Sequence, residues 1–86
     1  MSMQYLETVS HFIVENFLFG DAESLKEDTS FLEEGIVDST GILELVFFLE
    51  ETYGIKVEDD ELVPENFDNL SRIVKYLERK LNLVAG

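Results

Sequence analysis

The fold is decided by residues 38–54, which have the sequence DSTGILELVFFLEETYG. Asp, Ser and Thr stand at the front, and these side chains accept hydrogen bonds from the free N–H groups of a helix start. The Gly at position 54 favours the left-handed turn that ends many helices. Between them, apolar residues recur at i, i+3, i+4, i+7 and i+11, the spacing of one helical face. The pattern predicts an amphipathic helix that begins at Asp38-Ser39-Thr40 and buries a stripe of Ile42, Leu45, Val46, Leu49 and Tyr53.

Helical patterns also lie on both sides of this segment. Apolar residues at helical spacing predict a first helix over about residues 3–18, ended by Gly20-Asp21, and a last helix that starts at Leu70 after a cap at Asp68-Asn69. Pro64 favours the first turn of a helix and predicts a short third helix within an acidic stretch. The expected fold is all-α: a small four-helix bundle with three longer helices, one short third helix and a long loop between helices one and two.

Residues 20–37 form that long loop. Gly35 interrupts it and is able to supply a positive φ. Four apolar residues should anchor the loop on the core: Phe31, Leu32, Ile36 and Val37.

Length and composition narrow the class of protein. The chain has 86 residues, so we expect residues 1–86 to form a single domain, with residues 82–86 as a frayed tail. There is no Cys, so thiol chemistry would have to come from a group attached to the chain. No apolar run reaches the length of a membrane span, and the first residues lack the features of a signal peptide. We therefore expect a cytoplasmic monomer with no membrane insertion.

The charge is strongly negative and uneven. The chain has 19 acids and 6 bases, for a net charge of −13. Residues 1–68 contain 18 of the acids, whereas residues 69–86 contain four of the bases. Such a surface repels nucleic acid and favours fast encounters with basic patches on partner proteins. Acidity also serves solubility alone, so the charge by itself does not establish a partner.

Few residues could catalyse a reaction. A Ser-His-acid triad needs a His beside its nucleophile, and nothing in the sequence brings His11, the single His, near a Ser. Paired-carboxylate catalysis needs a cleft, for which a bundle of this size has little room. The acidic run Asp59-Asp60-Glu61 lacks the spacing and the Gly of a calcium-binding loop. We expect a non-enzymatic protein with no stably bound metal.

The segment FLEEGIVDSTGILELV, residues 31–46, resembles the phosphopantetheine attachment region of acyl and peptidyl carrier proteins. In that family an Asp-Ser pair opens the second helix, and Glu-Leu-Val or a similar triplet follows five residues after the Ser. The segment LEETYGI, residues 49–55, is similar to the family's Leu-Glu-Glu-x-aromatic-Gly-Ile helix ending. The likeness covers nearly the whole chain, which is identified on these motifs as a member of the acyl carrier protein family.

The resemblance implies that Ser39 carries a covalent 4′-phosphopantetheine arm. A phosphopantetheinyl transferase would attach it from coenzyme A with Mg²⁺, and Asp38 matches the acidic residue that transiently helps hold this metal. The arm would carry acyl intermediates as thioesters to acyl-loading and acyl-processing enzymes in fatty acid and other lipid, polyketide or related biosynthesis. A helix start suits a phosphodiester, because free N–H groups and the macrodipole favour negative charge there. Taken alone, Asp38-Ser39 is also an ordinary helix cap.

The same resemblance implies a partner surface on the second helix. Leu43 and Phe47 lie off the apolar stripe and match positions by which carrier proteins dock, whereas Phe48 should widen the buried face. The acidic positions around them are Glu44, Glu50 and Glu51. An apolar anchor with an acidic rim suits a transient interface, although each Glu fits a solvated helix face equally well.

Two residues depart from the family pattern. Thr40 stands where Leu is common and weakens an apolar anchor beside the arm. Gly41 stands where an acid is frequent, which removes one partner-facing charge and lets a partner approach the backbone. These departures favour a specialised stand-alone acyl carrier over the housekeeping fatty-acid carrier. Two alternatives stay open: an aminoacyl or peptidyl carrier whose cargo stays outside the bundle, and an unmodified acidic helical adaptor for a basic partner.

Overall fold

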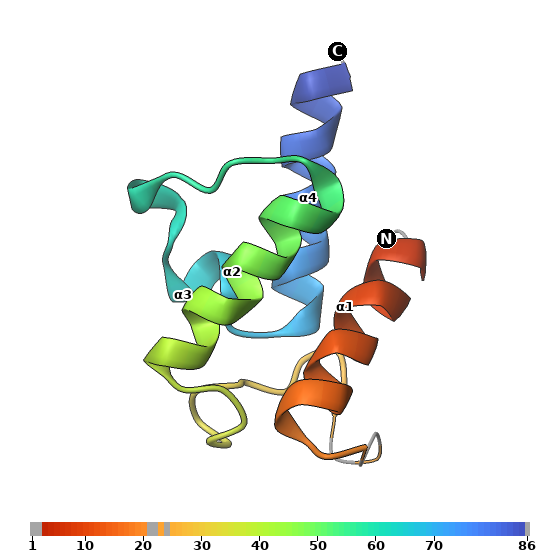
Figure 1. Cartoon of the computed structure of the whole chain (residues 1–86), viewed down its shortest axis with the longest axis vertical. Coiled ribbons are helices and arrows are strands. Elements are labelled where there is room, and N and C mark those ends of the chain that lie inside the picture. Colours follow the sequence, from red (N-terminus) through yellow and green to blue (C-terminus); the bar gives the residue numbers. More distant parts are fainter. Residues whose placement is uncertain (1–2, 21–22, 24, 86) are drawn as a thin grey trace.

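The computed structural model describes residues 3–20, 23 and 25–85. The helices in this part of the chain, shown in Figure 1, are α1 Met3–Phe17, α2 Ser39–Tyr53, the 3₁₀ turn η2 Asp59–Glu61, α3 Pro64–Phe67 and α4 Leu70–Ala85. The short helix α3 and the long helix α1 both pack against α4. The predicted all-α fold, with three longer helices and a short third one, is confirmed.

α2 begins and ends where the sequence predicts. Asp38 is its N-cap, and the Asp38 carboxylate accepts a hydrogen bond of 2.7 Å from the backbone N–H of Gly41. Gly54 follows the last turn with a left-handed φ of 65° and donates its N–H to the carbonyl oxygen of Glu50. The Asp38 cap therefore sets Ser39 as the first residue of the helix, and Gly54 ends the helix after Tyr53.

The core lies where the three long helices meet. From the predicted stripe of α2, Leu45, Val46 and Leu49 are buried, whereas Ile42 and Tyr53 are half-buried and pack against the core. Side chains with no exposed surface come from all three helices: Val9, Ile13, Leu45, Leu49, Ile73, Val74 and Leu77. Tyr76 is also buried, with 2% of its surface exposed. The helical spacing of the last helix does not include it, because the predicted apolar positions are Leu70, Ile73, Val74, Leu77 and Leu81. Phe12 and Phe48 are half-buried and pack against this core.

The loop before α2 is held by two buried side chains and by the α3–α4 junction. Phe31 and Val37 are buried as predicted, and the Phe31 N–H donates to the carbonyl oxygen of Asp68 over 2.8 Å. The prediction that Leu32 anchors the loop is wrong, because its side chain is 45% exposed. The Leu32 N–H donates to the Asp68 carboxylate, and in this turn the side chain lines a pocket instead of entering the core.

α1 ends in a left-handed turn. Phe19 and Gly20 have φ values of 52° and 90°, and the Gly20 N–H donates to the carbonyl oxygen of Val14 over 3.0 Å. The left-handed conformation is usual for Gly, and here the non-glycine residue Phe19 adopts it as well. The predicted helix end is confirmed at Gly20, whereas Asp21 lies outside the described residues.

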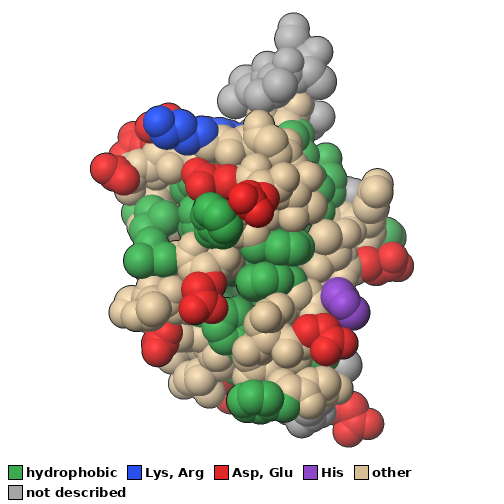
Figure 2. Space-filling view, viewed as in Figure 1, with side chains coloured by type: hydrophobic (Ala, Val, Ile, Leu, Met, Phe, Trp, Pro, Cys, Tyr) green, Lys and Arg blue, Asp and Glu red, His purple; other side chains and the backbone are tan. Residues whose placement is uncertain are grey.

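α4 starts with the expected cap and continues further than expected. The Asn69 side chain accepts a hydrogen bond of 2.8 Å from the Arg72 N–H. The helix runs to Ala85, and position 86 lies outside the described residues, so fraying of the tail stays a prediction. Within the described part of the chain, no helix is long and apolar enough to cross a membrane. Acidic side chains outnumber basic ones on the face in Figure 2.

Candidate functional site

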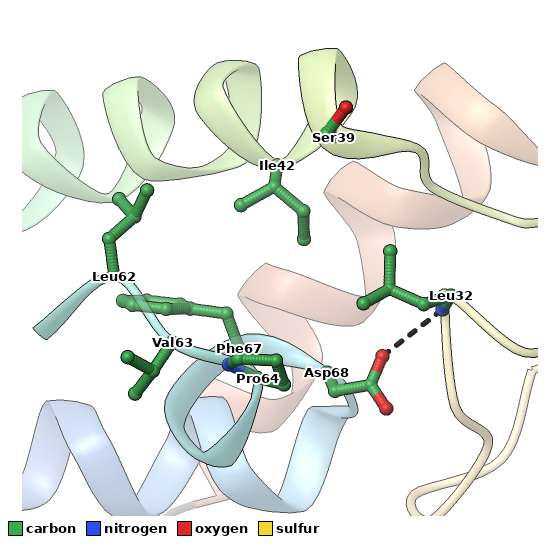
Figure 3. Close-up of a pocket in the computed structure, with 8 residues that line it drawn as sticks. All are labelled: Leu32, Ser39, Ile42, Leu62, Val63, Pro64, Phe67 and Asp68. Carbon is green, nitrogen blue, oxygen red and sulfur yellow. Dashed lines mark hydrogen bonds between the residues drawn. The ribbon is translucent and has the colours of Figure 1, made fainter.

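Ser39 stands at the exposed start of α2. The first N–H groups of a helix lack intrahelical partners, and a macrodipole places about half a positive charge at this end. A phosphodiester on the Ser39 hydroxyl would therefore be stabilised here. In Figure 3 the hydroxyl points away from the apolar side chains beneath it, so a modifying enzyme is able to reach it.

A pocket of about 190 Å³ lies beside Ser39, between α2, α3 and the loop before α2. Ile42 points into it from α2 (Figure 3). Its lining, which is apolar apart from Ser39 and Asp68, consists of Leu32, Ser39, Ile42, Leu62, Val63, Pro64, Phe67 and Asp68. An apolar pocket with few polar groups is typical of a site for an apolar ligand. Most of these walls are not apparent from sequence patterns, and the one local signal is the apolar pair Leu62-Val63 inside an acidic stretch.

Asp68 holds one wall of the pocket. One oxygen of its carboxylate accepts a hydrogen bond of 2.5 Å from the Ser30 hydroxyl, and the other accepts one of 3.1 Å from the Leu32 N–H. Figure 3 shows the second of these bonds. A single side chain at the α3–α4 junction therefore positions the turn that carries Leu32.

Glu61 holds another wall, directly before Leu62. Its Oε1 accepts hydrogen bonds from Lys80 Nζ over 2.7 Å, the Glu58 N–H over 2.9 Å and the Tyr76 hydroxyl over 3.1 Å. The hydrogen bonds from Lys80 and from the Glu58 N–H hold the pKa of Glu61 below its ordinary value of 4.5. Burial raises the pKa of Tyr76, and its hydrogen bond to Glu61 raises it further. At neutral pH the tyrosine therefore stays protonated and donates to the carboxylate.

The residues expected at the partner surface fall into two groups. Four of them line one depression between α1 and α2: Leu43, Glu44, Phe47 and Glu51. Leu43 and Phe47 are 57% and 61% exposed, so they are available for contact. Glu50 is half-buried, and its carboxylate accepts a hydrogen bond of 2.8 Å from the Val57 N–H. That bond gives Glu50 a structural role in holding the segment that follows α2.

Gly41 does not face partners, contrary to the expectation from the sequence. It is buried, and a Cβ there would lie 2.8 Å from Val37 Cγ1 and 2.9 Å from Phe17 Cε1. The absence of a side chain therefore allows the loop and the end of α1 to pack closely on the first turn of α2. Thr40 is exposed and lines the depression between α1 and α2.

Comparisons with known proteins agree on one family. The family described as "Phosphopantetheine attachment site" matches residues 16–77. The chain is 34% identical over 76 residues to an acyl carrier protein of Helicobacter hepaticus, an alignment covering 88% of this chain and 96% of that protein. It is 33% identical over 67 residues to the probable acyl carrier protein PigG of a Serratia species, covering 78% and 77% of the two chains.

Two solved structures are also similar to the chain. The solution structure of a holo acyl carrier protein from Nitrosomonas europaea has a TM-score of 0.77 at 27% identity, covering 93% of this chain and 99% of that one. A chain in the crystal structure of an FAD-dependent dehydrogenase has a TM-score of 0.71 at 33% identity, covering 80% of this chain and 97% of that one.

The helical bundle and the matched attachment-site family together define a phosphopantetheine-binding carrier. Its cofactor is 4′-phosphopantetheine, and the exposed hydroxyl of Ser39, at a helix start beside an apolar pocket, fits that group. The chain belongs to the acyl carrier protein family, and it is a non-catalytic carrier. Membership implies a phosphopantetheinyl transferase and acyl-processing enzymes as partners.

Proposed function

We propose that Ser39 carries the 4′-phosphopantetheine, which when bound supplies a terminal thiol for a thioester-linked cargo. The observation that carries this proposal is the exposed hydroxyl at the first residue of α2, next to the apolar pocket. The helix start stabilises the negative phosphodiester. Asp38 uses Oδ1 to cap the helix, and Oδ2, which has no hydrogen-bond partner among the described residues, is available to a transient Mg²⁺ during the transfer.

The cargo in this proposal is an acyl chain of short to medium length. The pocket volume of about 190 Å³ corresponds to that of roughly six water molecules at about 30 Å³ each in the liquid. A methylene group has a similar volume. Each methylene buried there contributes about 0.8 kcal/mol. An aminoacyl cargo gains little by comparison, because its ammonium group would lose hydration against Ile42, Leu62 and Phe67.

The pathway in this proposal is a dedicated branch of lipid, polyketide or related biosynthesis, served by a specialised carrier and not by the housekeeping one. Thr40 supports this, and so does the similarity to PigG and to a chain in the structure of an FAD-dependent dehydrogenase. Gly41 no longer supports it, because it serves packing. Residues 1–86 act as one cytoplasmic, monomeric carrier domain that meets enzymes through their basic patches.

Modification of the apo chain tests the attachment residue. Incubation with coenzyme A, Mg²⁺ and a broad-specificity phosphopantetheinyl transferase should raise the intact mass by one phosphopantetheine group. Ser39→Ala should abolish the gain, whereas Thr40→Ala, which removes the neighbouring hydroxyl, should keep it. An unmodified wild-type chain, or a mass gain in Ser39→Ala, would show that the proposed site is wrong.

A series of acyl chains tests the cargo. Holo protein loaded with butanoyl, hexanoyl, octanoyl, dodecanoyl or hexadecanoyl groups should gain thermal stability with each methylene that enters the pocket, and then level off beyond about octanoyl. Chemical shifts of Ile42, Leu62 and Phe67 should change with the same series. Changes confined to Ser39 and its sequence neighbours would contradict burial of the chain.

A further inference from the structure

Phe67 forms the inner end of the pocket beside Ser39. Among the described residues that line this pocket, Phe67 alone is buried, with 1% of its surface exposed. In Figure 3 its ring lies beneath Ile42 and Leu62, on the side of the pocket that faces α4. The walls nearer to solvent are open, since Leu32 and Leu62 are 45% and 37% exposed. An acyl chain that enters from Ser39 therefore reaches the Phe67 ring last.

A second aromatic ring supports Phe67 from behind. The ring centroids of Phe67 and Tyr76 lie 4.9 Å apart, with the ring planes at 56°, and Tyr76 on α4 is 2% exposed. Aromatic pairs at this distance attract each other beyond the area that they bury. Tyr76 is not among the residues that line the pocket. Its ring occupies the space into which the Phe67 ring would otherwise retreat.

Polar contacts hold Tyr76 in turn. Its hydroxyl donates to Glu61 Oε1 over 3.1 Å, and Lys80 Nζ donates to the same oxygen over 2.7 Å. Asn66, the residue before Phe67, donates from Nδ2 to the carbonyl oxygen of Glu61 over 2.8 Å. The ring behind Phe67 and the backbone before it are therefore both tied to one residue, which limits movement of the inner end of the pocket.

We propose that Phe67 determines the greatest length of acyl cargo that the carrier buries, with Tyr76 as the positioning residue that keeps the Phe67 ring in place. The inference rests on the proposed function, because the chain attached at Ser39 is the one that enters the pocket. Protein interiors are close-packed, so a ring supported in this way moves only when the core around it is disturbed. Methylenes beyond the Phe67 ring stay outside and gain no burial. One side chain thus makes the carrier selective for short and medium chains.

A chain-length series tests the proposal. A phosphopantetheinyl transferase loads wild type, Phe67→Leu and Phe67→Ala from acyl coenzyme A thioesters, from butanoyl to tetradecanoyl in steps of one carbon. In wild type each added methylene should raise the melting temperature by about 3–6 °C, and the rise should end near octanoyl. Phe67→Leu should extend the rise by at least one methylene. Phe67→Ala removes the ring and should extend it further, because a larger cavity is left to fill.

Two further variants separate the stop from general loosening of the core. Ile13→Val lies on α1, is fully buried and is outside the pocket lining. It should lower the melting temperature by about 5 °C and leave the length limit unchanged. Tyr76→Leu removes the supporting ring and should extend the limit although residue 76 does not line the pocket. Circular dichroism checks that each variant folds.

A contact measurement locates the end of the chain. In decanoyl-loaded Phe67→Leu, nuclear Overhauser contacts should join the terminal methyl group of the cargo to the Tyr76 ring. In wild type loaded with the same group these contacts should be absent, because the Phe67 ring lies between the chain and Tyr76. Contacts to Tyr76 in wild type would show that the chain passes Phe67, and the proposal would then be wrong.

Three stability results would also overturn the proposal: a wild-type rise that continues through tetradecanoyl, a limit that stays in place in both Phe67 variants, or an equal extension in Ile13→Val. Intact mass reports loading separately, so failure at Ser39 is told apart from failure of the stop. If Ser39 does not load, the same series is attached as alkyl disulfides to Ser39→Cys, whose thiol is unique in a chain without Cys. The shift of the limit with Phe67 is then measured on that chain, with the same outcomes deciding.

Discussion

At the scale of single residues, Asp38 serves both the fold and the site. Its carboxylate caps α2 through the Gly41 N–H, and it stands directly before Ser39. A cap requires only a side-chain oxygen that accepts a hydrogen bond, whereas Mg²⁺ prefers a charged carboxylate. The two roles can therefore be separated by a substitution that keeps the oxygen and removes the charge.

Asp38→Asn should make that separation. We expect the free energy of unfolding to stay within about 0.5 kcal/mol of wild type, because Asn is an equally good cap. The rate at which Ser39 gains phosphopantetheine should fall about tenfold, as a metal contact weakens. Asp38→Ala should lose the cap as well and cost about 1 kcal/mol. Urea unfolding and timed mass spectrometry measure the two effects, and equal stability losses in both variants would contradict the separation.

Gly41→Ala should destabilise the protein, although Ala is the better helix former by about 1 kcal/mol. The new Cβ would lie 2.8 Å from Val37 Cγ1 and 2.9 Å from Phe17 Cε1, and overpacking of this kind costs about 1–3 kcal/mol. We expect a net loss of about 1 kcal/mol in urea unfolding. Adding Val37→Ala to Gly41→Ala should cost less than Val37→Ala costs alone. A stabilised Gly41→Ala would mean that this packing is loose.

At the scale of elements, η2 fastens the pocket wall to the longest helix. Glu61 ends η2, and two of its donors, Lys80 and Tyr76, lie on α4. Leu62 follows Glu61 in the chain and lines the pocket. The wall therefore depends on a charged hydrogen-bond cluster, which makes it sensitive to acid.

Glu61→Gln should change how stability depends on pH. The pKa of Glu61 lies below its ordinary value of 4.5. The carboxylate therefore contributes fully to the stability of the fold above about pH 4.5, and this stabilisation is lost as the pH falls through the lowered pKa. The difference in unfolding free energy between wild type and Glu61→Gln should be constant above about pH 5.5 and shrink below about pH 4.5. Glu65→Gln is the matched control for loss of one acid. A difference that does not vary with pH would contradict the role of this charge.

The sequence predicted those features of the helices that depend on residues close by in the chain. The ends of α2 follow from Asp38 and Gly54, and its buried face follows from periodicity. Leu32 could not be placed in this way, because its position is set by Asp68, 36 residues further along the chain. Tyr76 was missed because its ring packs against Phe67, which lies in another element.

The candidate site also contains residues that the local sequence predicts and residues that only long-range packing places. Ser39 and Asp38 could be identified from adjacent residues. The pocket walls could not, because they are brought together from α2, from residues 62–68 and from the loop before α2. Gly41 was misinterpreted for a similar reason, since its contact with Phe17 joins α2 to the end of α1.

At the scale of the whole molecule, the net charge of −13 acts on folding and on association in opposite directions. Like charges repel within the folded chain and reduce its stability, while the same charges attract basic partners. The chain measures 37 × 26 × 20 Å. At about 10 mM salt the Debye length is about 30 Å, so charges interact across most of the molecule, and at 0.1 M it is about 10 Å, so mainly neighbouring charges interact.

Raising salt from about 10 mM to about 0.1 M should therefore stabilise the fold and slow partner encounters. If screening relieves about 1 kcal/mol of self-repulsion, the melting temperature rises by about 4–8 °C for a domain of this size. Over the same series the rate of modification by the transferase should fall, because steering weakens. Asp28→Lys with Glu34→Lys, which makes the chain four units less negative, should reduce both slopes. A melting temperature that falls with salt would show that favourable ion pairs outweigh repulsion, and the opposition between the two effects would then be wrong.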